Sequence, residues 1–117
     1  MSVKILIISQ TNVGKALVNA ARATYKKLPI PIITYCVEGH DDPDELKQEL
    51  IQQVKIMDQG DGVLILTDLY GSTPSNISHE VQKVSKVKVS VVAGINLPML
   101  IKILNYPESS LETLVDK

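Results

Sequence analysis

The segment GVLILTDLYGSTPSN, residues 62–76, constrains the fold more than any other part of the chain. Its run Val63–Leu66 is apolar on both faces, as in a central strand of a parallel sheet that helices cover on either side. The run leads to the carboxylate of Asp68. Thr73 and Pro74 then favour the start of a helix, with Thr73 as the cap and Pro74 in the first helical position. A strand that presents a carboxylate and then opens a helix places chemistry at the carboxyl edge of a sheet.

Apolar runs followed by helical patterns recur along the chain. The predicted strands are Val3–Ile8, Ile32–Val37, Val63–Leu66 and Val87–Ala93. Because four strand–helix units fill 117 residues, we predict an α/β fold in which residues 1–117 form a single doubly wound α/β/α sandwich with right-handed crossovers.

The intervening segments have helical periodicity. The first helix is expected to begin at Gly14 and to bury a stripe of Ala16, Leu17, Ala20, Ala21 and Tyr25. The second is expected to have Asp42 as its cap and to bury Leu46, Leu50, Val54 and Met57. A third helix is expected over 74–85, a short one through Met99, Leu100 and Ile103, and a last helical turn or two over 111–115.

Two prolines, Pro29 and Pro31, precede the second strand and favour its position at a sheet edge. The expected order of the four parallel strands is therefore 2-1-3-4. In that order the winding reverses between the first and third strands, which opens a crevice between the loops 9–12 and 68–73. The loop that carries His40 is expected to border the same crevice.

Composition and charge exclude several functions. A net charge of -1 arises from 12 basic and 13 acidic residues scattered along the chain, so a nucleic-acid partner has no electrostatic support. The apolar stretch near the N-terminus is too short for a signal peptide or a membrane span, and we expect a cytoplasmic protein. The single cysteine, Cys36, cannot form an intramolecular disulfide; a buried, inert thiol is favoured over a reactive one.

No nucleotide, metal or redox motif is complete. The segment 11–16, TNVGKA, lacks the Gly at position 9 and the Ser or Thr at position 16 that a phosphate-binding P-loop requires. The loop after the first strand has no acid for magnesium, and paired cysteines are absent. We therefore expect neither a metal nor a cofactor.

Ordinary structural roles compete with functional ones at the predicted crevice. Asp68 suits a solvated carboxylate or a turn cap, and Ser72 and Thr73 are common capping residues. A helix N-terminus with two hydroxyl groups also suits an anion. His40 is more often a turn residue in such a loop, but its place on the crevice rim makes it a candidate.

Three stretches resemble a known family: Ile5–Leu17, Val63–Asn76 with its DLYGSTPSN motif, and Val91–Leu100, VVAGINLPML. Together they make nearly the whole chain similar to the IIA component of the mannose-type bacterial phosphoenolpyruvate-dependent sugar phosphotransferase system. This resemblance implies a homodimer that takes a phosphoryl group from the carrier HPr on a histidine. It then passes the group to a IIB partner, in association with a membrane permease complex.

One residue departs from the family pattern. The phosphoacceptor histidine of the family follows the first strand, and this chain has Gln10 there. An imidazole nitrogen has a nucleophilic lone pair, whereas the lone pair of an amide nitrogen is delocalised. The resemblance makes Asp68 the carboxylate that orients the family histidine. We therefore expect direct phosphotransfer at position 10 to be lost.

Three functions remain open from the sequence. The chain is a phosphocarrier that uses another nucleophile or has lost the activity in this copy. Alternatively, it is a non-catalytic regulatory domain that binds a partner or an anion. The third possibility, outside the family, is a small-molecule binder on a flavodoxin-like sheet.

Overall fold

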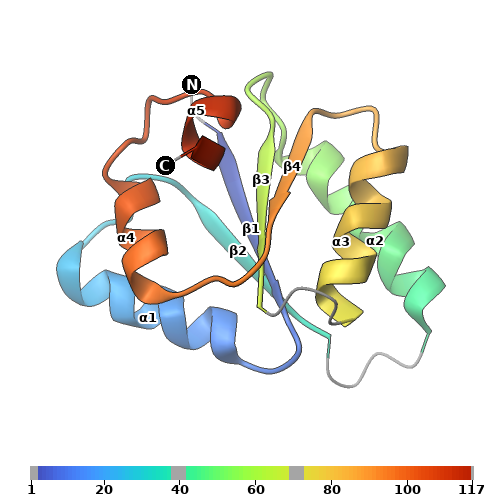
Figure 1. Ribbon diagram of the computed structural model, residues 1–117, viewed down its shortest axis with the longest axis horizontal. Coiled ribbons are helices and arrows are strands. Elements are labelled where there is room, and N and C mark those ends of the chain that lie inside the picture. Colours follow the sequence, from blue (N-terminus) through green and yellow to red (C-terminus); the bar gives the residue numbers. More distant parts are fainter. Residues whose placement is uncertain (1–2, 38–41, 69–72, 117) are drawn as a thin grey trace.

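A computed structural model describes residues 3–37, 42–68 and 73–116 of the chain (Figure 1). Its strands are β1 (Lys4–Ser9), β2 (Ile32–Cys36), β3 (Val63–Thr67) and β4 (Val89–Val92). They form a parallel sheet in the order β2-β1-β3-β4. The predicted α/β fold, strand order and edge position of β2 are confirmed.

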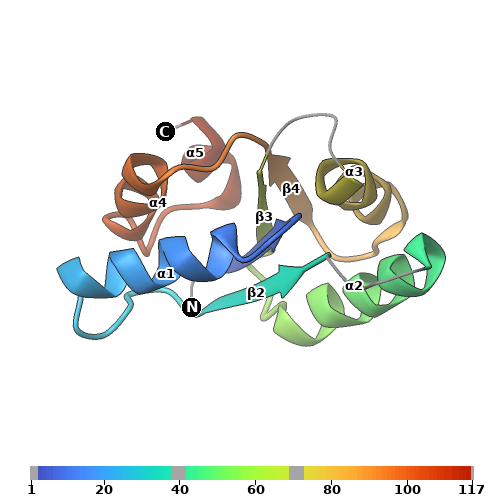
Figure 2. The same ribbon diagram turned by 90° about the horizontal axis from the view of Figure 1, so that it is seen from below.

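Helices cover both faces of this sheet. They are α1 (Val13–Thr24), α2 (Pro43–Met57), α3 (Thr73–Val84), α4 (Leu97–Leu104) and α5 (Leu111–Asp116). Figures 1 and 2 show α1, α4 and α5 on one face and α2 and α3 on the other. Among the described residues, no helix combines the length and apolar character needed to cross a membrane.

The central strand β1 contributes side chains to both layers of the hydrophobic core, one on each face of the sheet. Ile5 and Ile7 belong to the cluster beneath α1, α4 and α5, while Leu6 and Ile8 belong to the cluster beneath α2 and α3. All four side chains are fully buried. A strand that is apolar on both faces therefore stabilises two layers at once.

The predicted stripe of α1 was partly wrong. Gly14, Val18 and Ala21 are buried, whereas Ala16 is exposed. Leu17, Ala20 and Tyr25 are half-buried. Small residues line much of this helix, and alanine fits a packed face and an exposed one almost equally well.

The second helix matches its prediction. Leu46, Leu50, Val54 and Met57 are its buried residues. The Asp42 carboxylate caps its first turn and accepts a hydrogen bond from the Asp44 N–H at 2.9 Å. An acceptor at this position satisfies an N–H group that has no partner within the helix.

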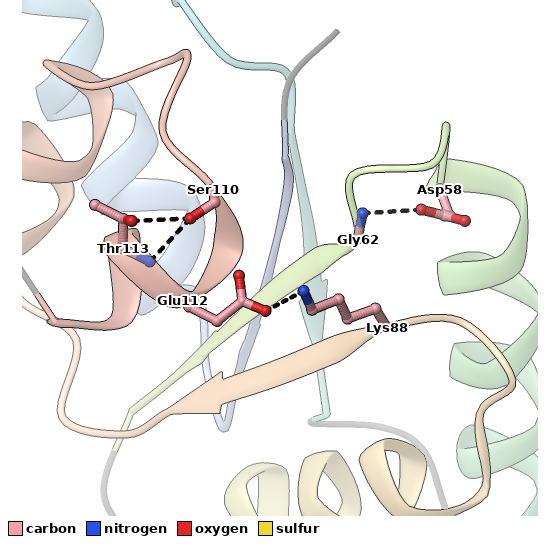
Figure 3. Close-up of polar contacts among 6 residues, drawn as sticks. All are labelled: Asp58, Gly62, Lys88, Ser110, Glu112 and Thr113. Atoms are coloured by element: carbon pink, nitrogen blue, oxygen red, sulfur yellow. Dashed lines mark hydrogen bonds and ion pairs between the residues drawn. The ribbon is translucent and has the colours of Figure 1, made fainter.

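Several predicted boundaries shift by one or two residues. Helix α3 begins at Thr73, so Thr73 is its first residue and the capping position falls outside the described residues. Strand β4 is shorter than predicted and begins at Val89. The residues around its start contact the last helix: Lys88 and Glu112 of α5 form an ion pair (Figure 3).

Turns at the amino edge of the sheet are held by side-chain caps (Figure 3). The Asp58 carboxylate accepts hydrogen bonds from the N–H groups of Gly60 at 3.1 Å and Gly62 at 3.0 Å. The Ser110 hydroxyl accepts one from the Thr113 N–H at 3.3 Å. These contacts lie at the opposite end of the strands from Gln10 and Asp68.

Candidate functional site

Gln10 and Asp68 meet at the carboxyl ends of β1 and β3. The main-chain N–H of Gln10 donates a hydrogen bond to Asp68 Oδ2 at 2.7 Å, although the residues are 58 positions apart in the chain. Gln10 is exposed and Asp68 is half-buried. The Asp68 carboxylate therefore holds the backbone at the position where the sequence analysis placed a phosphoacceptor.

The loop that carries Gln10 is fixed by the last residue of β1. Ser9 is buried, and its hydroxyl accepts a hydrogen bond from the Gly14 N–H at 3.3 Å. The same hydroxyl donates to the carbonyl of Thr11. Ser9 thus links both ends of the turn into α1, and its hydroxyl is used in structural bonds.

The loop after β4 forms hydrogen bonds to the main chain at the end of β3. The carbonyl of Asp68 accepts a hydrogen bond from the Gly94 N–H, and the carbonyl of Thr67 accepts one from the Ile95 N–H at 2.9 Å. Gly94 has φ of +81°, a conformation that glycine adopts without steric cost. The main chain of Asp68 is therefore tied to the β4 loop while its carboxylate is tied to Gln10.

Cys36 also lies beside this site, at the end of β2. It is half-buried, and its Sγ lies 3.6 Å from the carbonyl oxygen of Gln10, to which the thiol donates. The expectation of a buried thiol was wrong, because an edge strand has no neighbour to cover its outer side. The sequence did not indicate this neighbour of Gln10, because aligning the ends of the two predicted strands pairs Cys36 with Ile7, whereas the register in the sheet pairs it with Ser9.

Thr67, the last residue of β3, is a second residue near the site that the sequence did not single out. Its side chain is fully buried, and its Oγ1 has no hydrogen-bond partner among the described residues. Alternation along the strand places it on the same face as Val63 and Ile65, which pack toward α2 and α3. A polar residue that ends an apolar run was the available indication.

The remaining predicted site residues are only partly described. Thr73 is exposed at the start of α3. His40 and Ser72 lie outside the described residues. Across the described ranges, no group of three or more His, Cys, Asp and Glu side chains is placed to hold a metal ion.

The described side chains support binding by hydrogen bonds at this edge. The exposed side-chain amide of Gln10 offers a hydrogen-bond donor and an acceptor. The main-chain N–H of the same residue is bound to the Asp68 carboxylate. An amide does not displace a leaving group from phosphorus. The structure therefore shows a carboxylate bound to the backbone of position 10, whose amide side chain is not a nucleophile.

Comparisons with known proteins match this architecture. Residues 4–117 match the family model described as the fructose IIA component of the phosphotransferase system. Among curated protein sequences, none matches significantly.

Solved structures share the fold. The phosphotransferase system component EIIA from Streptococcus agalactiae is 22% identical, with a TM-score of 0.81 over 97% of this chain and 87% of that chain. The mannose/sorbose-specific IIA subunit from Enterococcus faecalis is also 22% identical, with a TM-score of 0.81 over 99% of this chain and 86% of that one. A IIA protein associated with the fucose utilization operon of Streptococcus pneumoniae is 23% identical, with a TM-score of 0.79 over 99% of this chain and 90% of that chain.

Proposed function

The chain belongs to the family of fructose- and mannose-type IIA components of the phosphotransferase system, and we propose that it has lost direct phosphotransfer at position 10. Its role lies in sugar uptake or the regulation of that uptake. The family implies HPr and IIB-type proteins as partners. The observation that supports the proposal is the hydrogen bond from the Gln10 N–H to Asp68; the resemblance to the family assigns its acceptor histidine to position 10.

The chemistry of transfer explains the loss. In the family's reaction a lone pair of a histidine ring nitrogen attacks phosphorus, and the bond from phosphorus to HPr breaks as the new bond forms. The Gln10 amide nitrogen has its lone pair delocalised into the carbonyl. It therefore preserves hydrogen bonding at this position and removes the attacking group.

The other residues of the proposed site are those that the resemblance to the family implies. Asp68 is the orienting carboxylate of this proposal, and Ser72 and Thr73 are its anion-binding hydroxyls. Thr73 begins α3, and the dipole of a helix favours negative charge near its N-terminus. We assign His40 to the rim of the pocket rather than to a relocated acceptor, since Asp41 and Asp42 would repel an incoming phosphoryl group.

The proposal extends to the setting of the protein. Residues 1–117 act as one mannose-type IIA-like domain in the cytoplasm, without metal or cofactor, and form a homodimer. Contact with a membrane permease complex occurs through the partner proteins.

Restoring the imidazole tests the proposal. Wild type and Gln10→His are incubated with phosphoenolpyruvate, enzyme I and a compatible HPr, and acid-labile phosphate on the chain is measured. We expect no label on the wild type and label on Gln10→His. Thr11→His is the matched control, because it places an imidazole on the next exposed residue and should stay unlabelled.

Two results would contradict the proposal in different ways. A folded Gln10→His that takes no phosphate would show that the pocket or the HPr-binding surface has diverged as well. Label on the wild type would show that a nucleophile survives elsewhere, and its disappearance in His40→Ala would identify that nucleophile as His40.

A further inference from the structure

The outer side of β2 is an open sheet edge. In a parallel ladder, successive residues direct their main-chain groups to opposite sides of the strand. The Ile5 N–H donates to the Pro31 carbonyl at 3.4 Å, and the Val37 N–H donates to the Ser9 carbonyl at 2.9 Å. Odd-numbered residues of this segment therefore face β1. The main-chain groups of the even-numbered residues 32, 34 and 36 face away from the sheet.

Within residues 3–37, 42–68 and 73–116, the usual protection of an edge strand is missing. Edges are commonly blunted by lysine, by bulges or by a proline that removes an outward N–H. Pro31 faces β1, so its missing N–H leaves the outer side unchanged. The pairing of Ile32–Cys36 with β1 runs without interruption, and the strand sequence IITYC contains neither lysine nor proline. All three outward N–H groups are retained.

A groove of about 890 Å³ adjoins this edge, between Tyr35 of β2 and the outer face of α2. Its apolar lining includes Tyr35 and Ile56, and the Ile56 side chain is 75% exposed. Ile33, two residues before Tyr35 on the same face of β2, is 38% exposed. Figure 2 shows β2 at the lower edge of the sheet with α2 to one side of it. The apolar side chains therefore lie next to main-chain groups that have no partner among the described residues.

The groove has one sign of charge. Of the lining residues that the structure describes, four are acidic and none is Lys, Arg or His; the acidic ones are Asp42, Asp44, Glu45 and Glu49. Burial raises the pKa of Tyr35 above its usual 10.0, and the nearby Glu49 carboxylate raises it further. The chain as a whole has a net charge of only -1, so this acidity is local and complements a cation.

We propose that the open edge of β2 and the adjoining α2 groove bind an extended segment of another protein that contains Lys or Arg. The segment adds to the sheet as a strand next to β2, pairing with the outward groups of Ile32, Thr34 and Cys36. Its apolar side chains pack against Tyr35 and Ile56, and its cations face the acidic rim. A second copy of this chain is disfavoured, because self-pairing would bring two identical acidic rims together.

Synthetic peptides test this edge directly. The probe is a labelled, end-capped Lys-Val-Lys-Val-Lys-Val peptide, and binding to the full chain is followed by fluorescence anisotropy at several salt concentrations. A Glu-Val-Glu-Val-Glu-Val peptide tests the sign of charge. A Lys-Val peptide N-methylated at consecutive amides keeps the charge and cannot pair as a strand.

We expect only the unmodified Lys-Val peptide to bind, with affinity that falls as salt rises. Hydrogen exchange should then slow at the amides of Ile32, Thr34 and Cys36. Glu45→Gln combined with Glu49→Gln should weaken binding by about fivefold, since rim charge pairs contribute modestly. The matched control, Glu80→Gln with Glu108→Gln, removes two exposed charges elsewhere and should bind as wild type does.

Ile56→Ser tests the contribution of apolar contact separately from that of charge, because it changes an exposed apolar side chain and leaves the acidic residues of the groove unchanged. It should weaken peptide binding without lowering thermal stability. Asp42 is left unchanged in all variants because it caps α2. None of the variants touches position 10, so failure here is distinguishable from failure of Gln10→His to accept phosphate.

Four results would overturn the proposal. These are absence of binding at millimolar peptide, equal binding of the N-methylated peptide, and equal weakening by the control pair. The fourth is wild-type self-association that Ile56→Ser abolishes, because it would make a second copy the occupant of the edge.

Discussion

Gly14 lies so close to β1 that a side chain has no room there. A Cβ at this position would be 2.6 Å from Ile7 Cγ2 and 3.5 Å from Ser9 Oγ. The Ile7 side chain is fully buried, so it has little freedom to move. The glycine allows α1 to approach the strand and lets its N–H reach the Ser9 hydroxyl.

We expect Gly14→Ala to destabilise the protein, although alanine is the better helix former. Overpacking typically costs about 1–3 kcal/mol, against roughly 1 kcal/mol gained in helix propensity. Urea unfolding should show a lower midpoint for Gly14→Ala and a nearly unchanged one for Lys15→Ala, an exposed neighbour. A Gly14→Ala variant as stable as wild type would contradict the packing argument.

Tyr35 gives a prediction for alkaline pH. Burial and the Glu49 carboxylate raise its pKa above 10.0 in the folded protein, while the unfolded chain lacks both effects. A raised folded pKa stabilises the fold below the unfolded pKa, and this stabilisation is lost as pH rises through the folded value. Stability should therefore fall above about pH 10.

The Tyr35→Phe variant should show a shallower loss of stability in this alkaline range. Urea unfolding at a series of pH values measures the slope for each protein. Ultraviolet absorbance of tyrosinate should also lose a component that titrates above 10.0. Identical slopes for Tyr35→Phe and wild type would contradict the prediction.

At the scale of single elements, α2 depends on its N-terminal cap. Asp42 accepts the Asp44 N–H at 2.9 Å, and Pro43 occupies the first helical position, which needs no N–H partner. The Asp42→Ala variant should lose about 1 kcal/mol of unfolding free energy. Asp42→Asn keeps a side-chain acceptor and should retain most of the unfolding free energy that the cap contributes. Equal losses in both variants, measured by thermal unfolding, would show that charge rather than capping matters.

At the scale of the whole molecule, the homodimer is expected to form through the face of α4 and α5. A groove of about 290 Å³ lies there between β4 and these helices, and its lining includes Val92, Met99 and Val115. Val115 is 41% exposed. Apolar side chains at such a surface favour burial against a partner.

Light scattering at micromolar concentration should give the mass of two chains. Val115→Asp should shift the protein toward monomer, because it places a charge in the apolar contact. Val84→Asp is the matched control, since Val84 is 52% exposed on α3 and lies away from the groove. A monomeric wild type would contradict the homodimer.

Local patterns in the sequence determined most of the architecture. Runs that are apolar on both faces identified the buried strands, and the prolines before Ile32 placed β2 at the edge. The predicted loss of a nucleophile came from the resemblance to the IIA family together with the identity of residue 10, and it stays a prediction. The cap at Asp42 was equally predictable, since its partner lies two residues away.

Contacts between distant segments were decided only by the tertiary structure. The bond from Gln10 to Asp68 spans 58 residues, and no local pattern indicates which atom of Gln10 the carboxylate meets. The buried side of α1 was set by the close approach of Gly14 to Ile7, because alanines suit either side. The acidic groove between Tyr35 of β2 and the outer face of α2 likewise exists only once α2 packs beside the sheet, because its lining comes from separate elements.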